Sequence, residues 1–314
     1  MTRNEQLKQP LTGIIPPMVT PLLEDMRLDL EGLTKLVEHL IAGGVSGLFI
    51  LGSSGESTSL SYAIRHQLIK ETCRRVAGRL PVLVGITDTA LAESLSLAET
   101  AQASGASAVV AAPPYYFNLN QKELFNYYEK LAGSLTLPLF LYNMPGLCKV
   151  HIEVSTAIRL SEHPNIIGLK DSSANSVYFQ SLYQSLRGKP DFTLLVGPEE
   201  AMAESVLMGG HGGVSGGANM FPKLFVKLYE AAAQKDFATV ADLQAIVMQI
   251  SNSLYGVGMY SSSYLKSIKA ALSLMNICQS HMAPPLAAFD AAETKHVTPI
   301  IEQFKLTLEK RGLL

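Results

Sequence analysis

Residues 137–170, LPLFLYNMPGLCKVHIEVSTAIRLSEHPNIIGLK, contain the pattern that decides the fold. Two apolar runs, at 137–143 and 166–170, flank a segment that is expected to be helical. The runs are hydrophobic throughout rather than alternating, which is typical of strands buried on both faces of a parallel sheet. The stretch therefore predicts one strand–helix–strand unit.

The same unit repeats along most of the chain. Strands are expected at 13–20, 47–52, 82–87, 108–112, 137–143, 166–170, 193–197 and 213–218, with starts about 20 to 35 residues apart. Asp29 is expected to cap the first helix, and Gly43 and Gly44 to end it. Eight strands alternating with helices predict an α/β fold of the (β/α)₈ TIM-barrel class. A doubly wound open sheet would show fewer strands and a glycine-rich turn after the first, which this chain lacks.

Helical periodicity continues beyond the eighth strand, at 220–235, 237–253, 263–274 and 299–310. A barrel needs only the first of these helices. We therefore expect a catalytic barrel over 1–236 and a C-terminal helical extension over 237–314, packed on the barrel or on a partner subunit.

Composition excludes several classes of function. The chain of 314 residues has a net charge of −2, which favours neither nucleic acid nor an anionic membrane as a partner. Its three cysteines form no C-x-x-C pair, so no metal site is predicted. No apolar run is long enough to cross a bilayer. Arg3, Glu5 and Lys8 stand where a secretion signal would be apolar, and a cytoplasmic location is expected.

In a barrel of this class the active site lies at the C-terminal ends of the strands. Lys170 ends the sixth expected strand, where its side chain points either into the barrel or outward. Burial disfavours the ammonium form of a lysine, and the neutral amine attacks ketones to give a Schiff base. The alternative is a surface lysine in a loop.

Two neighbouring features fit the same chemistry. Tyr142 ends the adjacent strand, from which a phenol can transfer protons to and from substrate oxygen. Its alternative role is an amphipathic strand-end tyrosine with its hydroxyl in water. Residues 52–56, GSSGE, form a turn whose hydroxyl and N–H groups can bind a carboxylate, although an ordinary Gly/Ser loop looks the same.

Taken together, these residues resemble the dihydrodipicolinate synthase / N-acetylneuraminate lyase family of pyruvate-dependent class I aldolases. The family's G-[ST]-[ST]-G-E turn appears at 52–56, its Y-N-x-P segment at 142–145 and its G-[ILV]-K segment at 168–170. Each motif is weak alone, but three in the right order, at the expected strand ends, make a strong match. The resemblance covers roughly residues 11–219.

The resemblance implies a role for each matching residue. Lys170 forms the imine, Tyr142 shuttles protons, and Ser53 links Tyr142 to a second tyrosine, Tyr116, which in many relatives reaches across a dimer interface. The implied substrate-binding residues are Ser53, Ser54, Gly55, Ser172, Gly197, Glu199, Glu200, Ser215 and Gly216. No cofactor and no metal are implied, and a homotetramer built as a dimer of dimers is expected.

Departures from the family pattern bear on the second substrate. The arginine that holds a substrate carboxylate in dihydrodipicolinate synthases is replaced by Leu147. Glu199 and Glu200 align with acids that contact sugar hydroxyls in sialic-acid lyases, yet acids after a proline also mark a helix start. The serine expected on the eighth strand is Gly216, so the sugar site is not that of a standard sialic-acid lyase.

The leading hypothesis is therefore a Schiff-base aldolase or lyase that acts on a 2-oxo-3-deoxy sugar acid, with pyruvate as product or donor. Two alternatives remain within the same chemistry: a 4-hydroxy-tetrahydrodipicolinate synthase, which joins pyruvate to aspartate semialdehyde, and a dehydratase of 2-oxo-3-deoxy sugar acids. A third alternative is a non-catalytic barrel that binds 2-oxo acids and has a regulatory role.

Overall fold

A computed structural model of the chain describes Leu7 and residues 9–314. The prediction about a secretion signal rests on Arg3, Glu5 and Lys8, which lie outside the described residues. Within that part of the chain eight parallel strands form one sheet, in the order β1-β8-β7-β6-β5-β4-β3-β2. The strands are β1 (Gly13–Ile14), β2 (Leu48–Ile50), β3 (Val82–Gly85), β4 (Ala108–Ala111), β5 (Leu139–Asn143), β6 (Ile166–Asp171), β7 (Thr193–Val196) and β8 (Gly212–Gly213).

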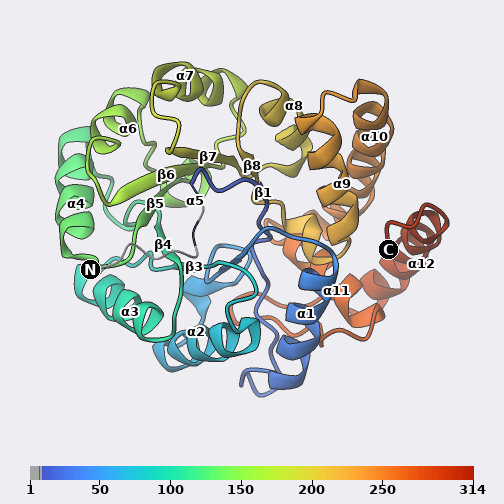
Figure 1. The fold of residues 1–314 in the computed structure, drawn as a ribbon. Helices are drawn as coiled ribbons and strands as arrows, with labels where there is room; N and C mark the ends of the chain where they lie inside the picture. Colours follow the sequence, from blue (N-terminus) through green and yellow to red (C-terminus); the bar gives the residue numbers. More distant parts are fainter. Residues whose placement is uncertain (1–6, 8) are drawn as a thin grey trace.

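The sheet closes into a barrel between its first two strands. Beyond β1, Met18 N–H donates to Phe49 O at 2.8 Å, and Phe49 N–H donates to Pro16 O at 3.0 Å. Figure 1 looks into this ring of strands and shows the helices arranged around it. The (β/α)₈ barrel expected from the sequence is therefore confirmed.

Helices between the strands cover the outside of the barrel, whereas the short α5 lies at its mouth (Figure 1). The helices of the described residues are α1 (Leu30–Ala42), α2 (Tyr62–Val76), α3 (Leu91–Ala103), α4 (Gln121–Ser134), α5 (Pro145–Cys148), α6 (Val154–Leu160), α7 (Ser176–Leu186), α8 (Met202–Leu207), α9 (Pro222–Ala233), α10 (Phe237–Leu254), α11 (Ser263–Leu274) and α12 (Ala291–Lys310), with short 3₁₀ turns η1 (Ser57–Ser59), η2 (Glu199–Ala201), η3 (Gly216–Asn219) and η4 (Val257–Met259). The Asp29 carboxylate accepts from Gly32 N–H at 2.9 Å, which confirms the predicted cap of α1.

Three predicted boundaries were wrong. The first strand was expected to run to residue 20 but ends at Ile14, ahead of Pro16 and Pro17, which have no N–H for a ladder. The eighth was expected at 213–218, but β8 ends at Gly213 and the chain then forms η3. The last helix was expected to start at Pro299 but begins at Ala291.

The barrel has two apolar cores, and successive side chains along β5 and β6 point alternately into one and the other. Leu141 of β5 and Leu169 of β6 belong to the larger core between the sheet and its helices. Phe140 and Tyr142 belong to a smaller core inside the barrel, together with Phe49 and Leu195. Successive side chains of a strand point to opposite faces, so the position that follows Leu169 also faces the interior.

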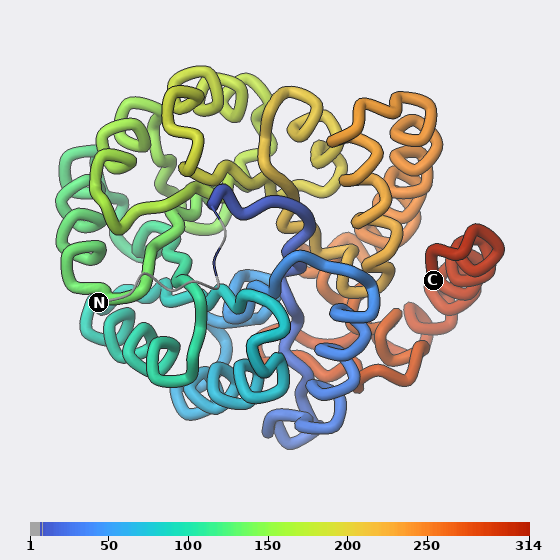
Figure 2. Tube along the Cα trace, in the orientation of Figure 1, coloured from blue at the N-terminus to red at the C-terminus, as the bar shows by residue number. Residues whose placement is uncertain are grey.

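The C-terminal helices lie beside the barrel. The colour-coded tube in Figure 2 shows the chain passing from α9 through α10 and α11 to α12, which ends on the outside of the molecule. Helix α11 packs against α12 and against η3, next to the barrel mouth. No helix of the described residues has the length and apolarity that crossing a membrane requires.

Candidate active site

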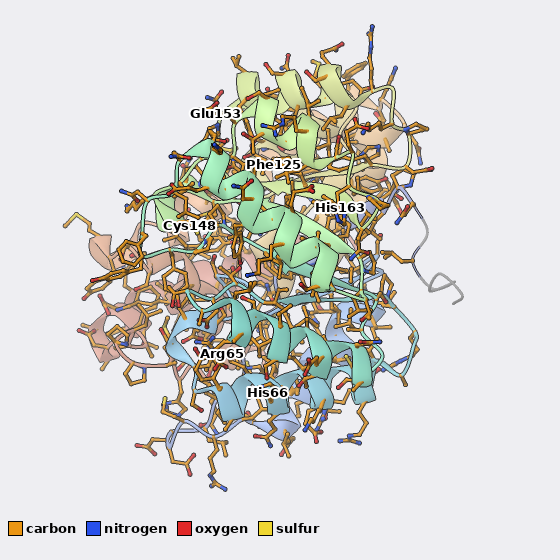
Figure 3. The ribbon with its side chains drawn as sticks, turned by 90° about the vertical axis from the view of Figure 1, so that its left-hand side faces the viewer. Arg65, His66, Phe125, Cys148, Glu153 and His163 are labelled. Carbon is orange, nitrogen blue, oxygen red and sulfur yellow. The ribbon has the colours of Figure 1, made fainter. Side chains whose placement is uncertain are left out.

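Lys170 and Tyr142 are partners in the parallel ladder between β5 and β6. Both side chains line the same cavity, of about 790 Å³, at the C-terminal end of the barrel. Figure 3 shows the barrel from the side: Cys148, which lines this cavity, lies near the C-terminal helices, whereas His163, which precedes β6, lies toward the other end. The expected position of the active site, at the C-terminal ends of the strands, thus coincides with a cavity that both Lys170 and Tyr142 line.

Lys170 is enclosed by aromatic rings. Its side chain is 5% exposed. The Nζ atom lies 4.1 Å from the centroid of the Tyr142 ring and 5.1 Å from that of Phe49. No salt bridge to Lys170 occurs among residues 9–314. The amine therefore faces the cavity free of a carboxylate partner, as a nucleophile toward a ketone requires.

Tyr142 is tied to the turn at the end of β2. The Tyr142 hydroxyl and the Ser53 hydroxyl are 3.4 Å apart, and either can donate. Ser53 and Ser54 both line the cavity. The link between Ser53 and Tyr142 that the resemblance implied is thus present as a contact within one chain.

The outward side of the same strands carries a second polar pair. Asn143 and Asp171 follow Tyr142 and Lys170 and are also ladder partners. The Asn143 amide donates to Asp171 Oδ1 at 2.8 Å, and Asn143 Oδ1 accepts from Ile152 N–H at 3.0 Å. Burial raises the pKa of the Asp171 carboxyl above its ordinary value. This buried pair fixes the ends of β5 and β6 and so fixes the relative positions of Tyr142 and Lys170.

Glu199 is buried and bound by other parts of the protein. Its carboxylate accepts from Gly217 N–H at 2.6 Å, from the Tyr255 hydroxyl at 2.6 Å and from the Tyr264 hydroxyl at 3.3 Å. Burial raises the pKa of the Glu199 carboxyl to about 7. The neighbouring Glu200 accepts from the Ser251 hydroxyl at 2.6 Å. Both acids line the cavity, in the 3₁₀ turn that leads to α8, so the helix-start interpretation holds and the contact with sugar hydroxyls stays a prediction.

Not every predicted residue reaches the cavity. Ser172 and Gly197 line it, whereas Gly55, Ser215 and Gly216 do not. A Cβ on Gly216 would lie 1.6 Å from the Tyr264 hydroxyl oxygen, so that tyrosine occupies the space beside the glycine. Ser215 is fully buried, and its hydroxyl has no hydrogen-bond partner among the described residues.

Tyr116 lies away from the cavity of its own chain. Its side chain is 79% exposed and its ring packs edge-on against Phe117, with centroids 5.2 Å apart. The preceding residue, Tyr115, lines the cavity instead. A role for Tyr116 within its own subunit finds no support in this geometry, and a role across an interface stays a prediction.

Sequence reasoning missed the part of the cavity wall that comes from α10, α11 and the loops beside them. The lining residues from this part of the chain are Ser251, Tyr255, Ser261, Ser262, Tyr264, Leu265 and Leu286. The sequence predicts the helices but gives no signal that turns these residues toward the strand ends. The segment 237–314 is thus part of the site, although its boundary with the barrel at 236 stays a prediction.

The (β/α)₈ barrel, with a buried lysine and a tyrosine paired at its mouth, belongs to the class of barrels that can form a covalent imine with a ketone substrate. Residues 10–304 match the model of the dihydrodipicolinate synthetase family. The chain belongs to this family, whose members are pyruvate-dependent class I aldolases and lyases, and it is an enzyme of that class.

Similar proteins carry two kinds of name. The structure of dihydrodipicolinate synthase from Bacteroides thetaiotaomicron superposes with a TM-score of 0.92 at 56% identity, covering 95% of this chain and 100% of that one. The putative 2-dehydro-3-deoxy-D-gluconate aldolase YagE of Escherichia coli K12 is 33% identical over 298 residues, 94% of this chain and 97% of that protein. The structure of YagE in complex with pyruvate gives a TM-score of 0.89 and covers 95% of this chain and 99% of that one.

Proposed function

We propose that the protein is a class I aldolase that cleaves or forms a 2-oxo-3-deoxy sugar acid through an imine on Lys170. The observation that carries the proposal is the position of Lys170, which lies against Tyr142 and is the one lysine or arginine among the described residues that line the cavity. The acidic residues of the lining are Glu56, Glu199 and Glu200.

The rest of the cavity wall suits a neutral, hydroxylated substrate tail. Hydroxyl groups from four regions of the chain line it: Ser57, Thr58, Ser59, Thr87, Ser172, Ser251, Ser261 and Ser262. Hydroxyl and carboxylate oxygens accept hydrogen bonds from polyol groups. A second carboxylate on the substrate would meet acids and hydroxyls in this wall. It would also meet the apolar side chain of Leu147, which is 57% exposed. Aspartate semialdehyde is therefore the poorer match.

The chemistry uses the groups already described. The Lys170 amine adds to the C2 ketone, and the Tyr142 hydroxyl donates the proton with which the carbinolamine loses water, which gives a protonated imine and a Tyr142 phenolate. The phenolate takes the proton from the C4 hydroxyl, the C3–C4 bond breaks, and its electrons neutralise the imine to give an enamine and an aldehyde. Tyr142 returns this proton to C3 of the enamine, and water then hydrolyses the protonated imine to pyruvate and the free amine, with the released proton passing back to Tyr142. Ser53 and Ser54 hold the substrate carboxylate with their hydroxyl and N–H groups.

A dihydrodipicolinate synthase is the second candidate, because a relative with 56% identity carries that name. One experiment separates the two candidates. The purified enzyme is given 2-oxo-3-deoxy sugar acids of five and six carbons, with pyruvate release followed by lactate dehydrogenase, and in parallel pyruvate with aspartate semialdehyde. We expect pyruvate release from a sugar acid to have the higher kcat/KM. Efficient condensation with aspartate semialdehyde, without cleavage of any sugar acid, contradicts the proposal.

The same screen distinguishes cleavage from dehydration. The protonated imine also acidifies C3–H, and loss of hydroxide from C4 would then give a dehydrated 2-oxo acid instead of pyruvate and an aldehyde. Product analysis by mass spectrometry detects this outcome directly. Activity that persists undiminished in the presence of EDTA is expected, because the proposed mechanism uses no metal or organic cofactor.

We further propose a homotetramer built as a dimer of dimers, located in the cytoplasm, in which Tyr116 completes the cavity of a neighbouring subunit. Its 79% exposure and its exposed partner ring, Phe117, support this proposal. Mixing the inactive variants Lys170→Ala and Tyr116→Ala after mild dissociation should restore activity, because one site of a mixed dimer contains both native residues. Light scattering that gives a monomer, with Tyr116→Ala fully active, contradicts it.

A further inference from the structure

The turn that carries Ser53 and Ser54 is held at its end by a buried ion pair. Glu56, the last residue of the turn, pairs with Lys269 of α11, and both side chains are completely buried. Glu56 Oε2 also accepts from Ala283 N–H at 2.6 Å, and Lys269 Nζ donates to His281 O at 2.6 Å. The turn is thus fastened to a helix and a loop more than 200 residues later in the chain.

Stability alone does not account for this pair. Removing two charges from water is costly, and their mutual attraction offsets that cost only when geometry and further hydrogen bonds are favourable. Burial lowers the pKa of the Lys269 ammonium, and the negative charge of Glu56 acts in the opposite direction. An apolar pair of similar volume would stabilise the fold as well. What the ion pair supplies in addition is a directional restraint on the turn.

The turn needs such a restraint. Leu51, just before it, and Glu56 both have a positive φ, of 55° and 57°, a conformation that side chains other than glycine adopt at a cost. Between them, the Thr20 hydroxyl donates to Gly55 O at 2.7 Å. A Cβ on Gly55 would lie within 3.3 Å of three backbone atoms, so the turn also packs closely against the chain beneath it.

We propose that Glu56 and Lys269 are positioning residues that fix the Ser53–Ser54 hydroxyl and N–H groups for the carboxylate of the 2-oxo acid. The proposal rests on the proposed function, because it takes the imine on Lys170 as the chemical readout. It assigns to the C-terminal helices a direct part in substrate selection: they determine whether the turn can bind a carboxylate, while the amine acts on any ketone that enters.

The test compares two ketones in a trapping assay. Pyruvate and hydroxyacetone are similar in size, but only pyruvate has a carboxylate. Each is incubated with the full-length enzyme and cyanoborohydride, and the rate of adduct formation on Lys170 is measured by mass spectrometry. The ratio of the two rates reports the carboxylate contribution and cancels any general loss of reactive amine.

Three variants and one control are compared. Lys269→Met and Glu56→Gln each break the ion pair, and the double variant Glu56→Met with Lys269→Met removes both charges. The control is Lys266→Met, on the same helix, where Nζ lies over the rings of Tyr260 and Phe289 and not against the turn. A single change leaves one buried charge without its partner, so the double variant is expected to be the better folded.

We expect the pyruvate-to-hydroxyacetone ratio to fall about tenfold in all three variants, the effect of losing a charge-assisted hydrogen bond, and to stay unchanged in Lys266→Met. The double variant regains thermal stability without regaining the ratio. A folded double variant that keeps the wild-type ratio overturns the positioning role. A wild-type enzyme that forms no adduct with either ketone instead contradicts the proposed function.

Discussion

Replacement of Tyr142 by phenylalanine separates the chemical role of its hydroxyl from the packing role of its ring. The ring packs edge-on against Phe49, with centroids 6.3 Å apart, and Phe retains this contact. The hydroxyl has one hydrogen bond among the described residues, a long one of 3.4 Å to Ser53. Its removal should therefore change the free energy of unfolding by less than about 1 kcal/mol.

The effect on catalysis should be much larger. A positioned acid–base group contributes roughly a hundredfold to ten-thousandfold to a rate, so kcat for sugar-acid cleavage should fall by that factor in Tyr142→Phe. The amine of Lys170 remains, so borohydride should still trap a pyruvate adduct, although more slowly. Steady-state release of pyruvate, adduct formation and urea unfolding measure the three quantities.

The matched control is Tyr183→Phe, which removes a hydroxyl from a half-buried tyrosine that packs near Gly209, outside the cavity lining. It should leave kcat unchanged. If Tyr142→Phe keeps kcat within a factor of about three of the wild-type value, the assignment of proton transfer to this hydroxyl is wrong. If the variant traps no adduct at all while it remains folded, the hydroxyl is needed earlier, for formation of the imine.

Three further outcomes are expected. Lys170→Ala should abolish both turnover and borohydride trapping, and substantial activity in this variant refutes the imine mechanism. Burial raises the pKa of Glu199 to about 7, so the folded state binds this proton more tightly than the unfolded state does. The protonated side chain therefore contributes to the free energy of unfolding in full below pH 4.5, and this contribution is lost as pH rises through 7. In urea unfolding, the free energy of unfolding of Glu199→Gln should rise by roughly 3 kcal/mol relative to that of the wild type between pH 4 and pH 8. Gly216→Ala should lower stability by about 1–3 kcal/mol through its clash with Tyr264, and Tyr264→Phe should recover part of that loss, which equal melting temperatures for Gly216→Ala and wild type would contradict.

Much of the barrel could be predicted from the sequence because its signals are local. Continuous apolar runs mark strands buried on both faces. The residues at the ends of these runs can be identified without knowing which strands pair. Lys170 and Tyr142 each end such a run, and adjacent parallel strands bring those ends to the same edge of the barrel. Asp29 could be identified as a cap for the same reason, since its partner, Gly32 N–H, is three residues away.

Some boundaries failed although a local signal was present. The helical periodicity that predicted the last helix was followed back only to Pro299. Asp290 and Glu293 carry the capping box that begins α12, with the Asp290 carboxylate accepting from Glu293 N–H at 2.8 Å and Glu293 Oε2 accepting from Asp290 N–H at 2.9 Å. Two reciprocal hydrogen bonds at the true start outweigh the cost of a proline two turns further along.

The cavity wall contributed by the C-terminal helices has no local signal. Tyr264 lies in the amphipathic helix α11 and Tyr255 directly follows α10, and neither position is marked as part of a site before the chain folds back on the barrel. Their hydroxyls then meet Glu199 in the turn after β7, and Tyr264 fills the space beside Gly216 in η3. Contacts between residues about 60 positions apart depend on tertiary packing, which the periodicity of a single segment does not encode.

The same packing suggests how one barrel chemistry is directed to a particular substrate. Lys170 and Tyr142 lie on strands, whose positions the closed ladder and the buried Asn143–Asp171 pair hold rigidly. Most of the residues that bound the remainder of the cavity lie outside the strands, among them those on α10 and α11, and these can change without disturbing the ladder. Imine formation therefore depends on the barrel strands. The length and polarity of the substrate tail that the cavity accepts depend on the helices that cover the barrel. On this argument, exchanging residues 251–265 with those of a relative should alter the preferred tail while adduct formation with pyruvate is retained.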